Sequence, residues 1–446
     1  MEQELEVDVK IISMETVKPS LPPPSNPKTH ILSVLDQITP IFHFPLLLYY
    51  SAGVPNQHGG VDISGLKTSL SQTLDQFHPL AGRFLDESTI SCNHQGIPFI
   101  ETKVNSRLLD VMISPHKMKL LTKFLPCQEF KTRPISELTP LVFQINVFLC
   151  GGVVIGCYVL HKLLDAISLG TFFKYWSSLT NTRFNNLVKP DFEAIIKAFP
   201  PLPKEKHIVI PHDEVFKDTP PTQPNNLNTM SVIKSYVFDD VSLSKLKARA
   251  TSELVPKPTR FEAVTGFIWE QILRNSGVEV EHTSLTMVVN IRQRVSPPLP
   301  RGSMGNLLRN ARAQAHTSSG LQDLVKEIHL ALSRTNQQIT TTTSAEVIWS
   351  ERKADYEAPL KHQQGYYCLS SWCKVGLDEV DFGFGKPVWI VPTDGRPPPI
   401  RNSICLTDYR HPQTGVEGIE AWVMLEQREI QCLQSNPVFL AFATPN

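Results

Sequence analysis

An uncharged run of twenty residues, 141–160, leaves few possible folds for this part of the chain; it reads LVFQINVFLCGGVVIGCYVL. Its length alone would span a bilayer. However, Gln144 and Asn146 place two amides in one half, and Gly151 and Gly152 interrupt the centre. Two runs rich in Val, Ile and Phe that are split by Gly-Gly are typical of a buried β-hairpin. We therefore expect a hairpin here and no membrane span.

Strands and helices alternate on both sides of this hairpin. Before it, the pattern predicts an edge strand over 7–14, a helix over 66–77 that ends before His78-Pro79, and strands over 89–92 and 98–104. After it, apolar spacing predicts helices over 169–179, 242–251 and 260–275, and strands over 231–238, 285–291, 367–371, 388–391, 403–409 and 418–425. This mixture predicts the α/β class.

Proline marks the boundary between two halves. The chain holds 36 prolines in 446 residues, and the stretch 199–228 combines many of them with little periodicity. We therefore expect an N-terminal αβ domain over 1–199, a crossover over 200–230 and a C-terminal αβ domain over 231–446.

Charge and cysteine content exclude several classes of protein. The formal net charge is zero, which argues against nucleic acid as a partner because such binding needs a basic surface. The eight cysteines form no CxxC pair and are too sparse for a disulfide scaffold, as expected of reduced thiols in the cytoplasm. The acidic first residues lack the apolar core of a signal peptide, so we expect none.

The candidate catalytic residues come from an HxxxD pattern, His161 to Asp165. The chain lacks GxSxG, HExxH, P-loop and GxGxxG motifs. HxxxD is weak by itself, since it also occurs at His58 to Asp62, in a polar, glycine-rich loop. His161 instead ends a β-rich apolar run before a helix, where a rigidly held side chain can face a cavity. A core or surface histidine remains an alternative at His161. A metal pair with Asp165 has no third ligand nearby, so we expect no metal.

The order of several motifs resembles the BAHD family of plant acyl-CoA-dependent acyltransferases. The HKLLD sequence at 161–165 and DFGFGKP at 381–387 match that family's HxxxD and DFGWG motifs, except that Phe384 replaces its tryptophan. Further agreement lies in ILSVLDQ at 31–37, HPLAGRF at 78–84, NIRQRVSPPLP at 290–300 with Gly305-Asn306, and SSWCKVGL at 370–377. The resemblance spans essentially the whole chain and is nearest to the family's alkaloid O-acetyltransferases.

The resemblance implies a fold and a mechanism. It implies two similarly sized mixed-sheet domains of the chloramphenicol-acetyltransferase type with a channel between them, in which acyl-CoA and an alcohol reach His161 from opposite sides. A neutral imidazole can take the proton of the attacking alcohol, so His161 is the expected general base.

The resemblance also implies roles for other residues. Asp165 pairs with Arg292 and thereby holds the histidine loop. Asp381 is placed with the candidate catalytic residues but is expected to support its own loop, whose turns are allowed by Gly383 and Gly385. Expected contacts to CoA, with oxyanion donors among them, are Lys257, Thr259, Arg260, Ser371 and Trp372. A solvated helix terminus at 257–260 and a packed strand at 370–372 are the alternatives.

The expected activity is O-acyl transfer, most simply from acetyl-CoA to a hydroxyl of an alkaloid or terpenoid. Alternatives within the family are transfer of a malonyl, benzoyl or hydroxycinnamoyl group, and acylation of an amine. An alternative of another class is a family member that binds ligands without catalysis. We expect acyl-CoA as co-substrate with no bound cofactor, a small-molecule alcohol as the other partner, no nucleic acid or membrane partner, and a cytoplasmic monomer.

Overall fold

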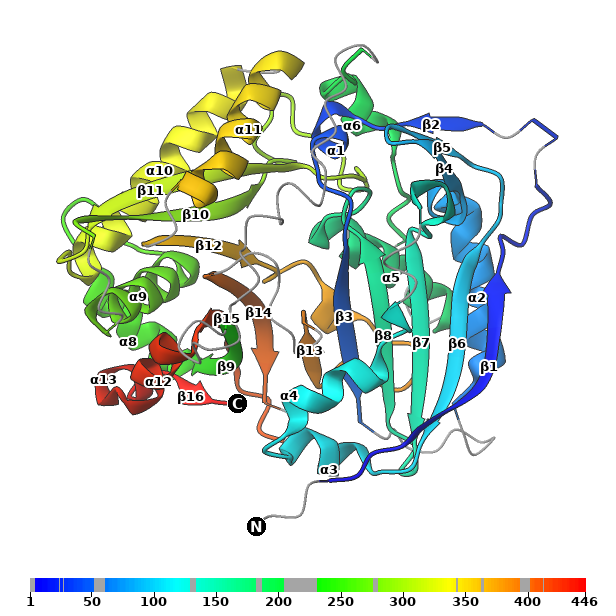
Figure 1. The fold of residues 1–446 in the computed structure, drawn as a ribbon, viewed down its shortest axis with the longest axis horizontal. Coiled ribbons are helices and arrows are strands. Elements are labelled where there is room, and N and C mark those ends of the chain that lie inside the picture. Colours follow the sequence, from blue (N-terminus) through cyan, green and yellow to red (C-terminus); the bar gives the residue numbers. More distant parts are fainter. Residues whose placement is uncertain are drawn as a thin grey trace. The chain divides into compact units, whose positions relative to one another are not determined.

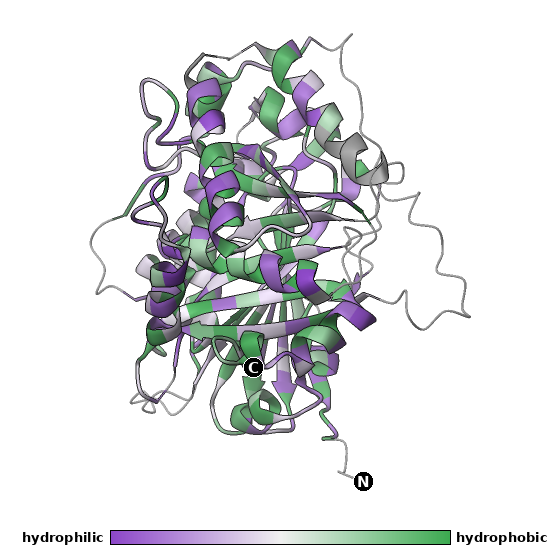
Figure 2. Ribbon diagram, turned by 90° about the vertical axis from the view of Figure 1, so that its left-hand side faces the viewer, coloured by the Kyte–Doolittle hydropathy of each residue, from purple (hydrophilic) through white to green (hydrophobic). Residues whose placement is uncertain are grey.

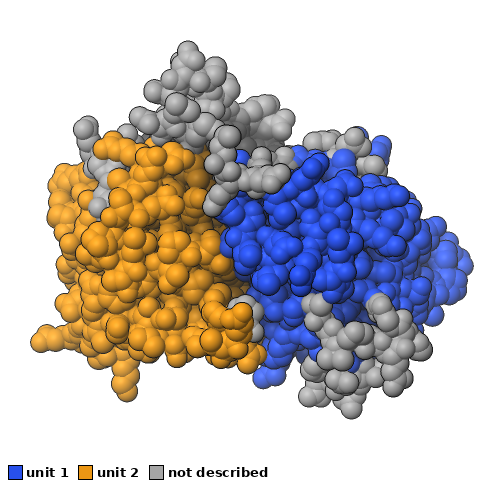
Figure 3. All heavy atoms as spheres, turned by 90° about the horizontal axis from the view of Figure 1, so that it is seen from below, with its two compact units in different colours: residues 1–212, 299–307, 374–395 blue, residues 213–298, 308–373, 396–446 orange. Residues whose placement is uncertain are grey.

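The computed structural model describes residues 5–23, 25–26, 28–51, 61–128, 134–181, 187–203, 231–275, 280–341, 344–361, 365–393, 402–411 and 413–446. Most of the expected crossover and the second HxxxD histidine, His58, lie outside these residues. The chain divides into two compact units, which Figure 3 colours separately. Unit 1 comprises 1–212, 299–307 and 374–395, and unit 2 comprises 213–298, 308–373 and 396–446.

Unit 1 is built on a six-stranded mixed sheet with the order β1-β6-β7-β8-β3-β13 (Figure 1). Its strands are β1 (Val9–Val17), β3 (His43–Tyr50), β6 (Ile97–Val104), β7 (Leu141–Phe148), β8 (Val153–Leu160) and β13 (Trp389–Val391). The β6–β7 pair is parallel and the other pairs are antiparallel.

The expected hairpin is confirmed as β7 and β8. The two strands pair antiparallel from Leu141 with Val159 to Val147 with Val153. Every residue of β8 is buried, and β7 and β3 flank this strand within the sheet. Among the described residues, no helix has the length and apolar content needed to cross a membrane.

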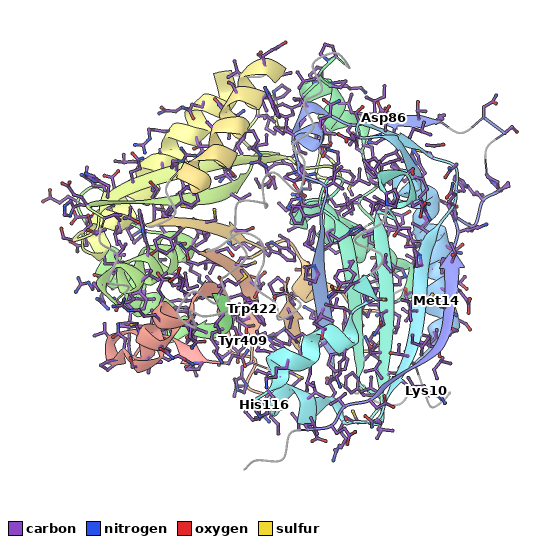
Figure 4. The ribbon with its side chains drawn as sticks, viewed as in Figure 1. Lys10, Met14, Asp86, His116, Tyr409 and Trp422 are labelled. Carbon is purple, nitrogen blue, oxygen red and sulfur yellow. The ribbon has the colours of Figure 1, made fainter. Side chains whose placement is uncertain are left out.

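The expected edge strand is also confirmed. Lys10 and Met14 lie along β1, the first strand of the sheet (Figure 4). Met14 is more than half exposed, as is Ile11, so this strand leaves apolar side chains in water.

Helices α2 (Ile63–Gln76) and α5 (Ala166–Thr180) pack against each other on one face of this sheet (Figure 1). Helix α2 ends at Gln76, before His78-Pro79, as the sequence predicts. The described residues of unit 1 also form a three-stranded sheet, β2 (Thr29–Ile31), β5 (Thr89–Ser91) and β4 (Arg83–Asp86). They further form the short helices α1 (Val34–Gln37), η1 (His78–Ala81), α3 (Leu108–Ile113), α4 (Lys117–Leu120), η2 (Leu121–Phe124), η4 (Ile135–Glu137), α6 (Glu193–Ala198) and η7 (Leu377–Glu379).

The domain assignment from sequence needs one correction. Residues 299–307 and 374–395, which we placed in the C-terminal domain, belong to unit 1. The physical reason for the second segment is strand pairing, since β13 pairs antiparallel with β3, from Trp389 with Tyr49 to Val391 with Leu47. The DFGFG motif is therefore carried by the same unit as HKLLD.

Unit 2 contains a seven-stranded mixed sheet with the order β11-β10-β12-β14-β15-β9-β16. Its strands are β9 (Ser231–Asp239), β10 (His282–Asn290), β11 (Leu308–His316), β12 (Tyr366–Ser371), β14 (Ser403–Arg410), β15 (Glu417–Glu426) and β16 (Thr444–Pro445). Trp422 of β15, labelled in Figure 4, is fully buried.

The described residues of unit 2 form the helices α8 (Asp240–Ala250), α9 (Arg260–Asn275), α10 (Leu321–Thr341), α11 (Ala345–Lys361), α12 (Gln427–Ser435) and α13 (Pro437–Leu440). Most helices show hydrophilic and hydrophobic stretches side by side (Figure 2), as expected when one face packs on a core. The sequence interpretation predicted α8 and α9 but not α10 or α11.

Candidate active site

His161 lies where the buried strand β8 ends, in the turn that leads to α5. Its backbone N–H donates to the carbonyl of Phe42, next to β3, at 2.8 Å. The imidazole is partly buried, and the ring centroids of Phe42 and Phe44 lie 5.0 and 5.2 Å from its own. The expected position, a rigid strand end facing into a helix turn, is therefore the observed one.

The imidazole is hydrogen-bonded to a side chain that we did not assign a role. Nδ1 of His161 lies 3.0 Å from Oδ1 of Asn306, which is almost completely buried. The amide Nδ2 of Asn306 donates to the carbonyl of His161 at 2.8 Å and to Oδ1 of Asp36 at 3.0 Å. The backbone N–H of Asn306 also donates to Asp36 Oδ1, at 2.7 Å. Asn306 therefore bridges the catalytic histidine candidate and a buried carboxylate.

Asp36 is a carboxylate in an apolar setting. Its side chain is only 2 % exposed, and Oδ2 accepts a hydrogen bond from Ser33 Oγ at 2.7 Å. Burial raises the pKa of Asp36 to about 6, although the hydrogen bonds from Ser33 and Asn306 act in the opposite direction. Asp165 nearby adds a smaller upward effect on this pKa.

Asp165, the second residue of the motif, is buried and caps a helix. It is the N-cap of α5, and its Oδ1 accepts the N–H of Ser168 at 2.8 Å. Its Oδ2 accepts the N–H of Leu307 at 3.1 Å, which ties the 305–307 segment to α5. These contacts tie Asp165 to the first turn of α5 and to the 305–307 segment. Its supporting role toward the loop that carries His161 stays a prediction.

Arg292 is buried in unit 2, where its guanidinium Nη1 donates to Asn290 Oδ1 at 3.1 Å. Its pairing with Asp165 stays a prediction.

Lys162, next to His161, is directed into the protein. It is 4 % exposed, and its ammonium donates to the carbonyls of Asp36, Gln37 and Thr39 at 3.0–3.4 Å. Burial lowers the pKa of Lys162 to about 8. The residue thus fastens the histidine turn to the end of α1, and Asn306 fastens it to the same helix through Asp36.

The DFGFG loop is held as the sequence interpretation expected. Asp381 Oδ1 accepts the N–H groups of Gly383 at 2.7 Å and Gly385 at 2.9 Å. Both glycines have positive φ, +101° and +90°, which disfavours any residue with a side chain. Phe382 is buried with its ring centroid 4.7 Å from that of Trp176, on α5. Phe384, the departure from the family's tryptophan, lies 5.2 Å from the Tyr50 ring.

The residues expected to contact the CoA phosphates lie at and just before the start of α9. Lys257 and Arg260 are exposed there. The N–H and hydroxyl of Thr259, however, both donate to Glu262 Oε2, at 2.7 and 2.8 Å, and Glu262 N–H returns a bond to Thr259 Oγ1. Thr259 therefore caps its own helix in the manner of a capping box, so both of its donors are engaged. Phosphate binding by Lys257 and Arg260 stays a prediction.

The oxyanion donor candidates lie where β12 ends. Ser371 is the last residue of β12, and the N–H of Trp372 donates to the carbonyl of Leu406 at 2.7 Å. Both side chains are partly exposed. Their role toward the thioester oxygen stays a prediction.

The described part of the chain was compared with two alternative chemistries, a metal site and a cysteine nucleophile. No group of three His, Cys, Asp or Glu side chains gathers there in a way that could hold a metal ion. Cys157, the one cysteine near the motif, is fully buried, and burial raises the pKa of its thiol well above the ordinary value. A buried neutral thiol is a poor nucleophile.

Two residues of this site had a signal in the sequence that we did not use. Asp36 is the acidic residue in the otherwise apolar or uncharged ILSVLDQ, and a carboxylate in such a run needs partners. For Asn306 the sequence offers only its place in the Gly305-Asn306 pair, which suggests no role toward His161. Its contact with Asp36 joins residues 270 positions apart, which no spacing rule predicts.

Known proteins resemble this chain over nearly its whole length. Stemmadenine O-acetyltransferase of Catharanthus roseus is 33% identical over 441 residues, covering 96% of both chains. Limonoid 21-O-acetyltransferase of Melia azedarach is 30% identical over 450 residues, covering 99% of both. The solved structure of vinorine synthase matches with a TM-score of 0.80 and 27% identity, covering 98% of this chain and 99% of the other.

The expected two-domain fold with mixed sheets is thereby confirmed. The Transferase family model matches residues 7–440. With the HKLLD turn and the DFGFG loop in place, the chain belongs to the Transferase family, the BAHD acyl-CoA-dependent acyltransferases.

Proposed function

We propose that this protein transfers an acetyl group from acetyl-CoA to a hydroxyl of an alkaloid or terpenoid, with His161 as general base. The observation that carries the proposal is the whole-length match to enzymes named as O-acetyltransferases of stemmadenine and of a limonoid. The geometry of the HKLLD turn supports it, since the histidine is partly exposed on a rigid strand end. The protein is further proposed to be a cytoplasmic monomer, and its eight free thiols accord with a reducing compartment.

The proposed reaction runs in two steps. The alcohol O–H gives its proton to the imidazole while its oxygen forms a bond to the thioester carbonyl carbon, and the carbonyl electrons move to oxygen. The tetrahedral intermediate then collapses, the carbon–sulfur bond breaks, and the CoA thiolate takes the proton from the imidazolium. Fixed hydrogen-bond donors to the oxyanion lower the barriers to forming and breaking down the tetrahedral intermediate. Ser371 and Trp372 are the proposed donors.

Direct transfer accords with the state of Cys157. An acylated enzyme would need a reactive nucleophile. The thiol of Cys157 is buried and has a raised pKa, so it does not serve as acyl carrier in this proposal.

The test is a thiol-release assay with purified protein. Acetyl-, malonyl-, benzoyl- and p-coumaroyl-CoA are each offered with a panel of alkaloid and terpenoid alcohols and amines. Acetyl-CoA with an alcohol should give the fastest release of CoA, and the acetylated product should appear by mass spectrometry. His161→Ala should lose at least about a hundredfold in turnover, whereas His58→Ala should match the parent. A fully active His161→Ala variant, or no turnover with any pair, would contradict the proposal.

A further inference from the structure

The hydrogen-bond partners of the buried Asn306 amide allow only one orientation of its Oδ1 and Nδ2 atoms. Its Nδ2 lies within hydrogen-bond distance of two atoms that only accept here, the carbonyl oxygen of His161 and Oδ1 of Asp36. Asp36 Oδ1 also receives the backbone N–H of Asn306, so this oxygen acts as an acceptor toward that segment. Rotating the amide by 180° would set Oδ1 against both acceptors and lose both bonds.

The orientation of the amide decides which nitrogen of His161 carries the proton. Asn306 Oδ1, an acceptor, faces Nδ1 at 3.0 Å, so the hydrogen bond between them requires a proton on Nδ1. In a neutral imidazole only one ring nitrogen is protonated, so the lone pair is on Nε2. Nε2 is then the atom that can take a proton from an alcohol.

The segment that carries Asn306 is clamped from two elements. Three successive backbone N–H groups are accepted by side chains: Gly305 by Ser168 Oγ at 3.0 Å, Asn306 by Asp36 and Leu307 by Asp165. Gly305 has φ of +114°, and an added Cβ would lie 2.6 Å from Ile195 Cδ1 and 3.1 Å from Asp36 Oδ2. The amide is therefore placed by the fold and not by contact with His161 alone.

We propose that Asn306, held by Asp36, is a positioning residue for the acyl transfer: it fixes the Nδ1–H tautomer and the ring orientation of His161, so that Nε2 serves as the base. This inference rests on the proposed function of His161. Neither Asn306 nor Asp36 touches the reacting atoms in this proposal, since they act through the imidazole. The arrangement replaces the carboxylate of other histidine bases with a neutral amide that is itself held by a carboxylate.

The test reads the tautomer directly in full-length protein labelled with ¹⁵N-histidine. The His161 signals are assigned by their loss in His161→Ala, and measured without substrates at a pH where the ring is neutral. We expect Nδ1 to show the signature of a protonated nitrogen and Nε2 that of an unprotonated one. An Nε2–H tautomer in the parent overturns the proposal, and this measurement needs no Asn306 variant to fold.

Asn306→Ala and a matched control complete the experiment. Asn146 is also a fully buried asparagine, with its Nδ2 bonded to the carbonyls of Phe124 and Val154, but it lies within β7, away from the histidine turn. With acetyl-CoA and the best acceptor of the panel, Asn306→Ala should lose at least about tenfold in kcat with KM values within about twofold. Its His161 signals should show both tautomers. Asn146→Ala should lower thermal stability but keep the parent's kcat and tautomer.

The outcomes of these measurements distinguish the positioning role from the alternatives. Unchanged kcat and tautomer in folded Asn306→Ala overturn the positioning role. An equal loss of kcat in Asn146→Ala also overturns it, because the effect would then be general destabilisation. If His161→Ala stays active while the parent shows the Nδ1–H tautomer, the proposed function fails and the assignment of the tautomer stands.

Discussion

Replacing Asp165 with alanine should lower the free energy of unfolding of unit 1, because the hydrogen bonds that this carboxylate accepts are lost. The size of the loss follows from those bonds. Loss of the N-cap of α5 costs about 1 kcal/mol. The N–H of Leu307, which Asp165 accepts inside the protein, would be left without that acceptor, at a cost of about 1–3 kcal/mol. Removing Asp165 also removes its small electrostatic repulsion of the Asp36 carboxylate, which offsets part of this loss of stability. The expected loss is therefore about 3 kcal/mol.

The second HxxxD sequence of the chain offers the matched control. Asp62 is also a helix N-cap, for α2, and its Oδ1 accepts the N–H of Gly65 at 2.8 Å. It is exposed, so water can replace the lost acceptor and the cost is about 1 kcal/mol or less. For a unit of this size, 1 kcal/mol corresponds to about 2–4 °C in Tm. Differential scanning calorimetry should therefore show a fall of about 6–12 °C for Asp165→Ala and about 1–4 °C for Asp62→Ala.

If Asp165→Ala lowers Tm no more than Asp62→Ala does, the buried Leu307 N–H contributes no extra stability and the expected 3 kcal/mol is refuted. Asp165→Asn can still cap α5 through Oδ1, but its amide N–H would oppose the N–H of Leu307. We therefore expect it to keep part of the stability and to lose activity by displacing the segment that carries Asn306. If Asp165 also pairs with Arg292, Arg292→Ala should lower both Tm and turnover, whereas an unchanged variant excludes the pair.

The remaining predictions concern pH, backbone, the DFGFG loop and kinetic order. Burial raises the pKa of Asp36 in the folded protein to about 6, whereas its pKa in the unfolded chain is near 4. The folded state therefore binds this proton more tightly, which contributes roughly 3 kcal/mol of stability below pH 4. That contribution is lost as the pH rises through 6. Denaturant unfolding should thus show Asp36→Asn gaining stability relative to the parent between pH 4 and 7, and a pH-independent difference would contradict the buried carboxylate. Gly305→Ala should cost about 1–3 kcal/mol and reduce kcat, since it strains the backbone beside Asn306; parent-like melting and turnover would show that the segment tolerates a side chain. Asp381→Ala should impair folding or the KM for acetyl-CoA more than kcat, because two loop N–H groups lose their acceptor; a normal Tm with lost kcat would make Asp381 catalytic. Initial-rate plots at varied acetyl-CoA and acceptor should intersect, whereas parallel lines or an acylated Cys157 would indicate a ping-pong mechanism.

The sequence predicts those elements whose burial follows a local period. The β7–β8 hairpin, α2 and α9 are examples, since each has its apolar pattern and its end signals within a single window. Helix α10 had such a pattern too, with Leu321, Leu324, Val325 and Ile328 buried, and could have been predicted. Strand β11 could not, because its buried residues are the small alanines Ala311, Ala313 and Ala315, with Arg312 and Gln314 between them.

The hydrophobic periodicity of the sequence cannot predict which distant segments pair with each other. The strand at 388–391 was predicted, but its partner β3 lies about 340 residues earlier, so the pattern could not assign it to unit 1. The same holds for the site: His161 and Asp165 were recognised from spacing and context, whereas Asp36 and Asn306 join them only in the folded chain.

The 305–307 segment gives the HxxxD motif a physical meaning that its spacing alone does not provide. His161 binds the side chain of Asn306, while Asp165, four residues further along the chain, binds the N–H of the next residue, Leu307. The two motif residues thus hold neighbouring points of one segment, and Asp36 holds that segment from a second element. Two carboxylates can lie buried near each other there because each accepts backbone N–H groups in place of water. A change at Asp165 therefore reaches His161 through Asn306, and the tautomer of His161 in Asp165→Asn is the observable that reports it.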